Sequence, residues 1–143
     1  MKEIFLDLDG VINHDIGYLN KIENFKFING RFEACKLFQS RGYKLIVVTN
    51  QSGIARGSYQ EKDFHMLTKW MFTQVDNQNI KILGVFFCTH GLSSNCSFCK
   101  PKLGMLIKAH EKYHINMVSL WTIGDKEGTL MQQLLLELII RYY

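Results

Sequence analysis

Short apolar runs alternate along the chain with segments of helical spacing. Four of the runs are rich in Ile, Val and Phe, as expected of strands buried on both faces of a parallel sheet, and they cover residues 3–8, 44–49, 82–88 and 119–123. Between them, apolar side chains recur every three or four positions, the period of an amphipathic helix, over residues 32–38, 64–75 and 105–113. The alternation predicts an α/β protein with a doubly wound parallel sheet, formed by residues 1–143 as a single domain.

The composition of the chain indicates which partners and which cellular compartment to expect. The net charge is only +4, and the lysines and arginines are scattered rather than clustered, so we expect no nucleic-acid partner. The longest apolar run, residues 134–140, is interrupted by Glu137 and is much shorter than a membrane span. No export signal is recognisable at the start of the chain. We therefore expect a cytoplasmic protein without a membrane partner, and a monomer.

Each predicted strand delivers polar or ligand-type side chains at its carboxyl end. These residues are Asp7 and Asp9, Thr49 and Asn50, Cys88 and His90, and Gly124 and Asp125. Because ligands of open α/β sheets bind beyond the carboxyl ends of the strands, the pattern predicts a functional site at this edge.

The acids at this edge favour phosphate chemistry around a magnesium ion. In an extended strand Asp7 and Asp9 would lie roughly 6.5 to 7 Å apart on the same side. At an effective dielectric constant near 20, their repulsion is about 2 to 3 kcal/mol, which a cation or a shared proton would relieve. With Asp125 they form a set of oxygen ligands suited to Mg²⁺. One carboxylate would then act as nucleophile and its neighbour as general acid and base. The structural alternative is that both acids only begin a turn at Gly10.

A second cluster has the composition of a zinc site. Cys88, His90, Cys96 and Cys99 lie within twelve residues and supply three thiolates and one imidazole, enough for a closed tetrahedral shell. We expect a structural zinc ion that fixes the loop of residues 88–99 and so places Lys100. The alternative is a set of buried thiols beside a hydrogen-bonded histidine. The spacing is a poor pattern for a disulfide framework, and Cys35 stands apart at core spacing.

Four motifs, DLDGVIN, VVTNQSGIARG, CKPKLGM and TIGDKE, resemble those of the haloacid dehalogenase-like phosphatases in their order. The chain is more closely similar to the D-glycero-D-manno-heptose 1,7-bisphosphate 7-phosphatases, a histidinol-phosphatase-like family, over residues 5–127. The stretches GYLNKIENFKFING and TNQSGIARG are particularly specific. The resemblance implies a Rossmann-like fold of this superfamily. The stretches between its motifs are too short to hold a cap domain.

The resemblance also implies a role for each matching residue. Asp7 would attack phosphorus and form an aspartyl-phosphate, while Asp9 would protonate the departing sugar oxygen and then activate water. Magnesium would be held by Asp7, the backbone carbonyl of Asp9, and Asp125. The remaining matches would bind the phosphorylated sugar, and they are Thr49, Asn50, Gln51, Arg56 and Lys100.

Two departures from the family pattern stand out. The family ends its metal loop with Cys-x-Cys-Arg-Lys-Pro, whereas this chain has Cys-x-x-Cys-Lys-Pro. Either Cys99 replaces the substrate-binding arginine, or the loop is re-registered and keeps four zinc ligands, and we favour the second. After Glu127 the family's second acid is replaced by Thr129, and residues 128–143 no longer resemble its last strand and helix. A lost nucleotide after Glu127 is one hypothesis, and we expect residues 129–141 to form a leucine-rich helix that docks on the sheet or aggregates.

Three functions remain open at this point. The favoured one is a magnesium-dependent phosphatase that removes the C7 phosphate of heptose 1,7-bisphosphate, in nucleotide-activated heptose and lipopolysaccharide biosynthesis. Histidinol-phosphate phosphatase is the nearest enzyme alternative. The third possibility is that the chain is a truncated, catalytically impaired copy. The sequence decides neither the sugar anomer nor the activity of this form.

Overall fold

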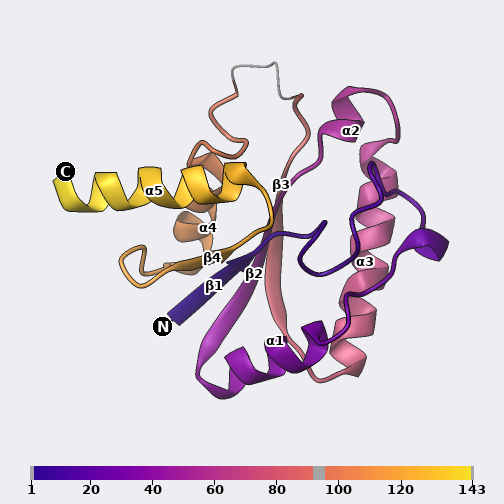
Figure 1. Ribbon diagram of the computed structural model, residues 1–143, viewed down its shortest axis with the longest axis horizontal. Coiled ribbons are helices and arrows are strands. Elements are labelled where there is room, and N and C mark those ends of the chain that lie inside the picture. Colours follow the sequence, from indigo (N-terminus) through magenta and orange to yellow (C-terminus); the bar gives the residue numbers. More distant parts are fainter. Residues whose placement is uncertain (1, 92–95, 143) are drawn as a thin grey trace.

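The computed structural model describes residues 2–91 and 96–142. Helices and strands alternate along the chain, as Figure 1 shows. In chain order they are β1 (Lys2–Leu6), η1 (Ile22–Asn24), α1 (Arg31–Ser40), β2 (Tyr43–Asn50), α2 (Ser52–Ala55), α3 (Glu61–Asn77), β3 (Ile82–Cys88), α4 (Gly104–Tyr113), β4 (Trp121–Ile123) and α5 (Glu127–Tyr142).

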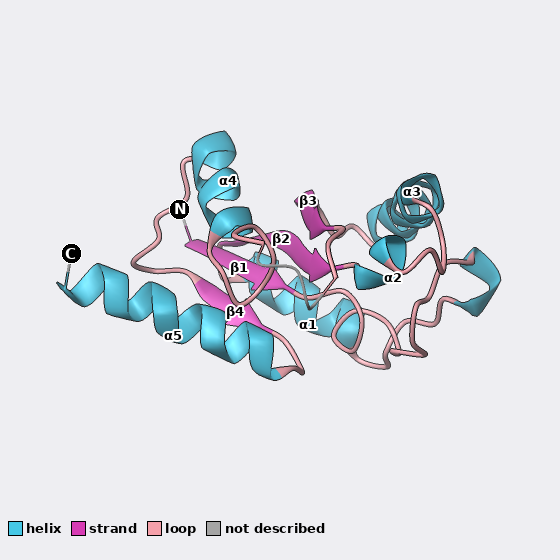
Figure 2. Cartoon of the chain, turned by 90° about the horizontal axis from the view of Figure 1, so that it is seen from above, coloured by secondary structure: helices cyan, strands magenta, loops and turns pink. Residues whose placement is uncertain are grey.

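The four strands form one parallel sheet in the order β3-β2-β1-β4. Helices cover both of its faces, with α4 and α5 on one side and α1 and α3 on the other (Figures 1 and 2). The predicted α/β doubly wound sheet is therefore confirmed. In the described residues, the connections from β1 to α1 and from β3 to α4 contain loops and the single turn η1 but no cap domain.

Two hydrophobic clusters fill the space between the sheet and its helices. Successive strand residues point to opposite faces, so Ile4 and Leu6 pack in one cluster and Phe5 in the other. The first cluster receives the apolar face of α3, and the second receives the apolar side chains of α4. Strands β1 and β2 are buried on both faces, which explains their continuous apolar runs. The prediction of a buried strand was wrong for β4, which lies at the edge of the sheet with Trp121 64% exposed.

Helix α5 forms where the sequence predicted a leucine-rich helix, and it docks on the sheet. Its inner side buries Thr129, Gln132 and Leu136, and Leu136 joins the cluster around α4. The Gln132 side chain donates a hydrogen bond of 2.6 Å to the carbonyl oxygen of Lys102. Three leucines on its outer side stay about half exposed, Leu130, Leu134 and Leu138.

Strands β1 and β4 have boundaries that differ from the predicted ones, and the short helix α2 was not predicted. Strand β1 ends at Leu6 rather than at residue 8, because the chain turns at Gly10 and bridges Asp9 to Asn13. Strand β4 begins at Trp121 rather than at residue 119. The four-residue helix α2 was not predicted, since a single turn has no measurable periodicity. Residues 92–95 of the predicted zinc loop lie outside the described residues. None of the described helices has the length and hydropathy needed to cross a membrane.

Candidate active site

A cavity of about 300 Å³ opens at the carboxyl end of the sheet, where the sequence predicted the site. Its walls come from the loop after β1, the end of β2, the segment around Lys100 and the start of α5. The lining residues are Asp7, Asp9, Thr49, Asn50, Lys100, Pro101, Lys126, Glu127, Gly128 and Thr129. Five predicted site residues are thus brought together. A larger cavity of about 620 Å³ beside β3 and α4 contains none of these five.

An ion pair between Asp7 and Lys100 forms the floor of this cavity. The Nζ atom of Lys100 lies 3.1 Å from Oδ2 of Asp7, and both residues are less than 9% exposed. Burial lowers the pKa of Lys100, and the charge of Asp7 opposes that shift. The other oxygen of Asp7 accepts a 2.7 Å hydrogen bond from the backbone N–H of Leu8. The carboxylate is therefore held in one orientation, with a cation beside it.

The Asp9 side chain is held by two amide donors. Asn13 donates to Oδ1 at 2.9 Å, and Gln51 donates to Oδ2 at 3.2 Å. Burial raises the pKa of Asp9, the two hydrogen bonds lower it, and the nearby charges of Asp15 and Asp7 raise it further, with a net upward shift. A carboxyl group with a raised pKa keeps its proton closer to neutral pH, as a general acid requires.

Asp125 lies directly against the loop that carries Asp7 and Asp9. A Cβ atom added at Gly10 would meet Oδ2 of Asp125 at 2.0 Å, so this position admits only glycine, which also has a φ of +86° there. The carboxylates of Asp7 and Asp125 and the backbone carbonyl of Asp9 are oxygen ligands of the kind Mg²⁺ takes. These residues fit the ion.

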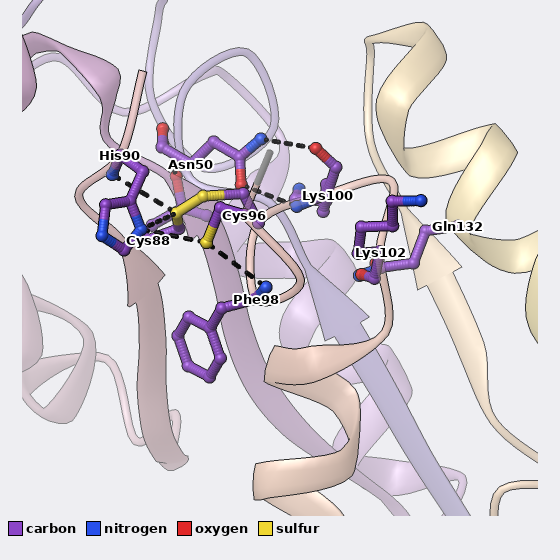
Figure 3. The surroundings of a disulfide bond; sticks show 10 residues. Asn50, Cys88, His90, Cys96, Phe98, Lys100, Lys102 and Gln132 are labelled. Carbon is purple, nitrogen blue, oxygen red and sulfur yellow. Dashed lines mark hydrogen bonds between the residues drawn. A yellow bond between two sulfur atoms is a disulfide. The ribbon is translucent and has the colours of Figure 1, made fainter. Parts of the chain in front are cut away.

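The end of β2 fixes Lys100 through its backbone. Asn50 donates from Nδ2 to the carbonyl oxygen of Lys100 at 3.2 Å and accepts from its N–H at 3.0 Å, as Figure 3 shows. Both ends of the Asn50 amide are therefore used in placing Lys100. Thr49 is 1% exposed and lines the cavity directly. Phosphate contacts by these residues stay predictions.

Two predicted binding residues lie outside the cavity wall. Gln51 is buried, and its amide is bonded to Asp9, Thr49 and Tyr59. Arg56 follows α2, and its guanidinium carbon lies 5.5 Å from the centre of the Tyr18 ring. Their contacts with substrate stay predictions.

Sequence reasoning missed two links that close the site. Lys126 forms a 3.0 Å ion pair with Asp15, which joins the loop after β1 to the segment before α5. Burial acts against the charge of Lys126, but the hydrogen bond and charge of Asp15 prevail and raise its pKa. Lys100 donates a 3.2 Å hydrogen bond to Oγ1 of Thr129, at the position where the family pattern has an acid. Both links join distant segments, so no local sequence signal could have indicated them.

The Cys/His cluster is brought together as predicted. The donor atoms of Cys88, His90, Cys96 and Cys99 all lie within 4.8 Å of one another. Figure 3 shows backbone N–H groups of His90 and Phe98 pointing at the sulfur atoms of Cys88 and Cys96, each at 3.4 Å. Such donors favour thiolates, and three thiolates with one imidazole fit a tetrahedral zinc ion.

The structure also joins Cys88 and Cys99 in a disulfide, with Cα atoms 5.2 Å apart, which the sequence analysis did not predict. The sequence gives the spacing of the cysteines along the chain but not the distances between their sulfur atoms. Sulfur atoms close enough to share one ion are also close enough to bond each other. Only thiolate sulfur binds zinc, so Cys88 and Cys99 can serve as zinc ligands only when they are not bonded to each other.

Comparisons with known proteins agree with the site. The family model described as "Polynucleotide kinase 3 phosphatase" matches residues 2–135. The chain is 47% identical over 124 residues to the D-glycero-α-D-manno-heptose-1,7-bisphosphate 7-phosphatase of Campylobacter jejuni, covering 87% of this chain and 71% of that protein. It is 41% identical over 130 residues to the D-glycero-β-D-manno-heptose-1,7-bisphosphate 7-phosphatase of Escherichia coli K12, covering 86% and 68%.

Solved structures show the same fold. The D,D-heptose 1,7-bisphosphate phosphatase of B. bronchiseptica, crystallised with magnesium and phosphate, superposes with a TM-score of 0.87 at 25% identity, covering 95% of this chain and 76% of that one. The corresponding enzyme of Burkholderia thailandensis superposes with a TM-score of 0.67 at 24% identity, covering 95% and 74%.

Proposed function

Because the chain belongs to the polynucleotide kinase 3 phosphatase family and to that of the heptose 1,7-bisphosphate 7-phosphatases, we propose that it removes the C7 phosphate of D-glycero-D-manno-heptose 1,7-bisphosphate. The observation that carries this proposal is the Asp7–Lys100 ion pair on the floor of the cavity. In this ion pair the proposed nucleophile lies beside a cation that would attract a phosphate dianion. The open cavity without a cap suits a small phosphorylated sugar.

We propose the reaction that the family resemblance implies for the two aspartates. An oxygen of Asp7 attacks phosphorus, the bond from phosphorus to the sugar oxygen breaks, and Asp9 gives its proton to that oxygen. This leaves an aspartyl-phosphate on Asp7. Asp9 then takes a proton from water as the water oxygen attacks phosphorus, and inorganic phosphate leaves with the Asp7 carboxylate restored. Lys100 and Thr49 stabilise the negative charge of the transferring phosphoryl group.

The magnesium ion would be held by Asp7, the backbone carbonyl of Asp9, and Asp125. When bound, it supplies positive charge that lets an anionic carboxylate approach an anionic phosphate. Gly10 leaves room for the Asp125 carboxylate beside the loop. The protein's own part is to keep Asp7 fixed through Leu8 N–H and Lys100.

We further propose that Cys88, His90, Cys96 and Cys99 hold a structural zinc ion in the reduced protein. The convergence of their donor atoms within 4.8 Å supports this role. Lys100 directly follows Cys99, so a rigid loop would fix the catalytic lysine. We place the protein in the cytoplasm, as a monomer without a nucleic-acid or membrane partner, in the biosynthesis of activated heptose for lipopolysaccharide.

Parallel measurements of phosphate release test the proposal. The purified chain is given Mg²⁺ and, separately, both anomers of the heptose bisphosphate, histidinol phosphate, and a 3′-phosphorylated oligonucleotide. We expect release from a heptose bisphosphate at least tenfold faster than from the other two compounds. Release from histidinol phosphate alone would establish the alternative enzyme, and release from the oligonucleotide alone would move the chain to nucleic-acid repair.

The variant Asp7→Asn is the control for the nucleophile. It keeps the volume of the side chain but removes the attacking carboxylate, so turnover should fall by at least about a thousandfold while the protein still folds. An Asp7→Asn protein with wild-type turnover would exclude Asp7 from the chemistry. No release by a folded wild-type chain from any of the compounds would support the impaired copy.

A further inference from the structure

A buried series of side chains leads from Tyr59 to Asp9. The hydroxyl of Tyr59 donates a hydrogen bond to Oε1 of Gln51. The Nε2 atom of Gln51 donates to Oδ2 of Asp9 at 3.2 Å and to Oγ1 of Thr49 at 3.0 Å. Tyr59 is 6% exposed and Gln51 is 4% exposed. The amide of Gln51 therefore has all of its described partners inside the protein.

Tyr59 bonds to the oxygen end of the Gln51 amide, and the nitrogen end faces Asp9. The oxygen and nitrogen ends of an amide have nearly the same shape, so packing alone does not distinguish them. A flipped amide would place an oxygen against the Asp9 carboxylate, where two acceptors repel each other. The Asp9 carboxylate therefore selects the orientation in which the NH₂ group faces it, and the Tyr59 hydroxyl, by donating to the amide oxygen, holds the amide in that orientation.

The environment of Tyr59 keeps it a donor. Burial raises the pKa of its hydroxyl well above the ordinary value, and the charges of Asp9 and Tyr18 raise it further. The phenol therefore keeps its proton at neutral pH and can donate to the Gln51 amide oxygen.

Close packing holds the Tyr59 ring in place. A Cβ atom added at Gly53 would meet Cε1 of Tyr59 at 2.3 Å and Cδ1 of Tyr18 at 2.7 Å, so the ring rests on the backbone of α2. Tyr59 also belongs to the cluster that packs α3 on the sheet. The hydroxyl is thus fixed before any substrate binds.

From these contacts we propose that Tyr59 is a positioning residue for the phosphatase reaction, acting through Gln51 to hold the Asp9 side chain toward the leaving oxygen. The inference rests on the proposed function and deepens it. Tyr59 does not line the cavity, so the rate would depend on a residue outside the cavity wall. It also gives Gln51 a supporting role rather than a direct contact with phosphate.

The variant Tyr59→Phe tests this role because it removes only the hydroxyl. We expect kcat to fall roughly three- to tenfold, the scale of one hydrogen bond to a catalytic group, with KM within twofold of the wild-type value. Gln51→Ala should lower kcat by at least as much. The double variant should be no slower than Gln51→Ala alone, because the two residues act in series.

Tyr113→Phe is the matched control. Its hydroxyl also donates a partly buried hydrogen bond, to the carbonyl oxygen of Leu83 at 2.9 Å, but it lies on α4 away from the cavity. The melting temperature should fall by a similar amount in both phenylalanine variants, whereas kcat should fall only in Tyr59→Phe. Equal kcat values in the two variants, or a fully additive double variant, would overturn the inference.

A spectroscopic measurement keeps the inference independent of activity. The side-chain NH₂ signals of Gln51 are assigned by their absence in Gln51→Ala. They should shift in Tyr59→Phe and stay in place in Tyr113→Phe. Unmoved signals in Tyr59→Phe refute the positioning role whether or not the wild type hydrolyses a phosphate ester, whereas an inactive wild type with shifted signals refutes the proposed function alone.

Discussion

At the scale of single residues, Glu3 is the side chain that the fold accommodates least well. It is 0% exposed, and neither carboxylate oxygen has a hydrogen-bond partner of normal geometry in the described residues. Burial raises its pKa, although the amino terminus and the backbone of Asn116 act in the opposite direction. The folded state therefore binds this proton more tightly than the unfolded state does. The contribution of Glu3 to the free energy of unfolding therefore rises as the pH falls toward the raised pKa. At neutral pH the charged carboxylate destabilises the fold.

The variant Glu3→Gln should consequently stabilise the protein at pH 7 by roughly 1 kcal/mol, because it removes a buried charge. The gain should shrink at pH 5, where the wild-type carboxyl is closer to its protonated state. Urea unfolding at the two pH values measures both effects. Glu111→Gln, at an exposed position on α4, is the control and should change stability by less than about 0.5 kcal/mol. Equal stability of Glu3→Gln and wild type at pH 7 would contradict this reading.

At the scale of secondary-structure elements, α5 is held by a few inner contacts and leaves a wide apolar surface outside. Leu136 is 3% exposed within the cluster around α4, while Leu134 on the same helix is 45% exposed. Leu136→Ala should lower the free energy of unfolding by about 2 to 5 kcal/mol, as for other buried leucines. Leu134→Ala should change it by less than about 0.5 kcal/mol. Similar losses in both variants, measured by urea unfolding, would show that α5 is not docked as described.

The elements were predictable because each has a strong local period. Strands β1 and β2 are buried on both faces and so appear as apolar runs. The Phe64, Leu67, Met71 and Val75 face of α3 is buried as its spacing predicted. The polar side chains at the strand ends were predictable for the same reason, since a parallel sheet places all four ends at one edge.

What the sequence did not predict depends on contacts between distant segments. The Gln51 amide takes partners from the loop after β1 and from Tyr59, and Lys126 pairs with Asp15 of that same loop. The early end of β1 depends on a bridge between Asp9 and Asn13. Neither periodicity nor local propensity contains such information. The division into one domain and the cause of the departure after Glu127 stay predictions.

At the scale of the whole molecule, the proposed zinc loop would connect structure to catalysis, because Lys100 follows Cys99 and lies against Asp7. Elemental analysis of the reduced protein by mass spectrometry should find one zinc ion per chain. Cys96→Ser should lose it and lower both the melting temperature and turnover. Cys35→Ser, on α1 outside the cluster, should keep the ion and the turnover. Zinc retained in Cys96→Ser, or absent from reduced wild type, would contradict the zinc site.

The central claim is that Asp7 attacks one particular phosphate of a sugar bisphosphate. Phosphorus NMR of D-glycero-D-manno-heptose 1,7-bisphosphate incubated with the chain and Mg²⁺ tests it most directly, because the two phosphates give separate signals. We predict that the C7 signal disappears as inorganic phosphate appears, that the C1 signal remains, and that Asp7→Asn leaves both signals unchanged. Loss of the C1 phosphate first, or loss of the C7 phosphate with Asp7→Asn, would contradict the account.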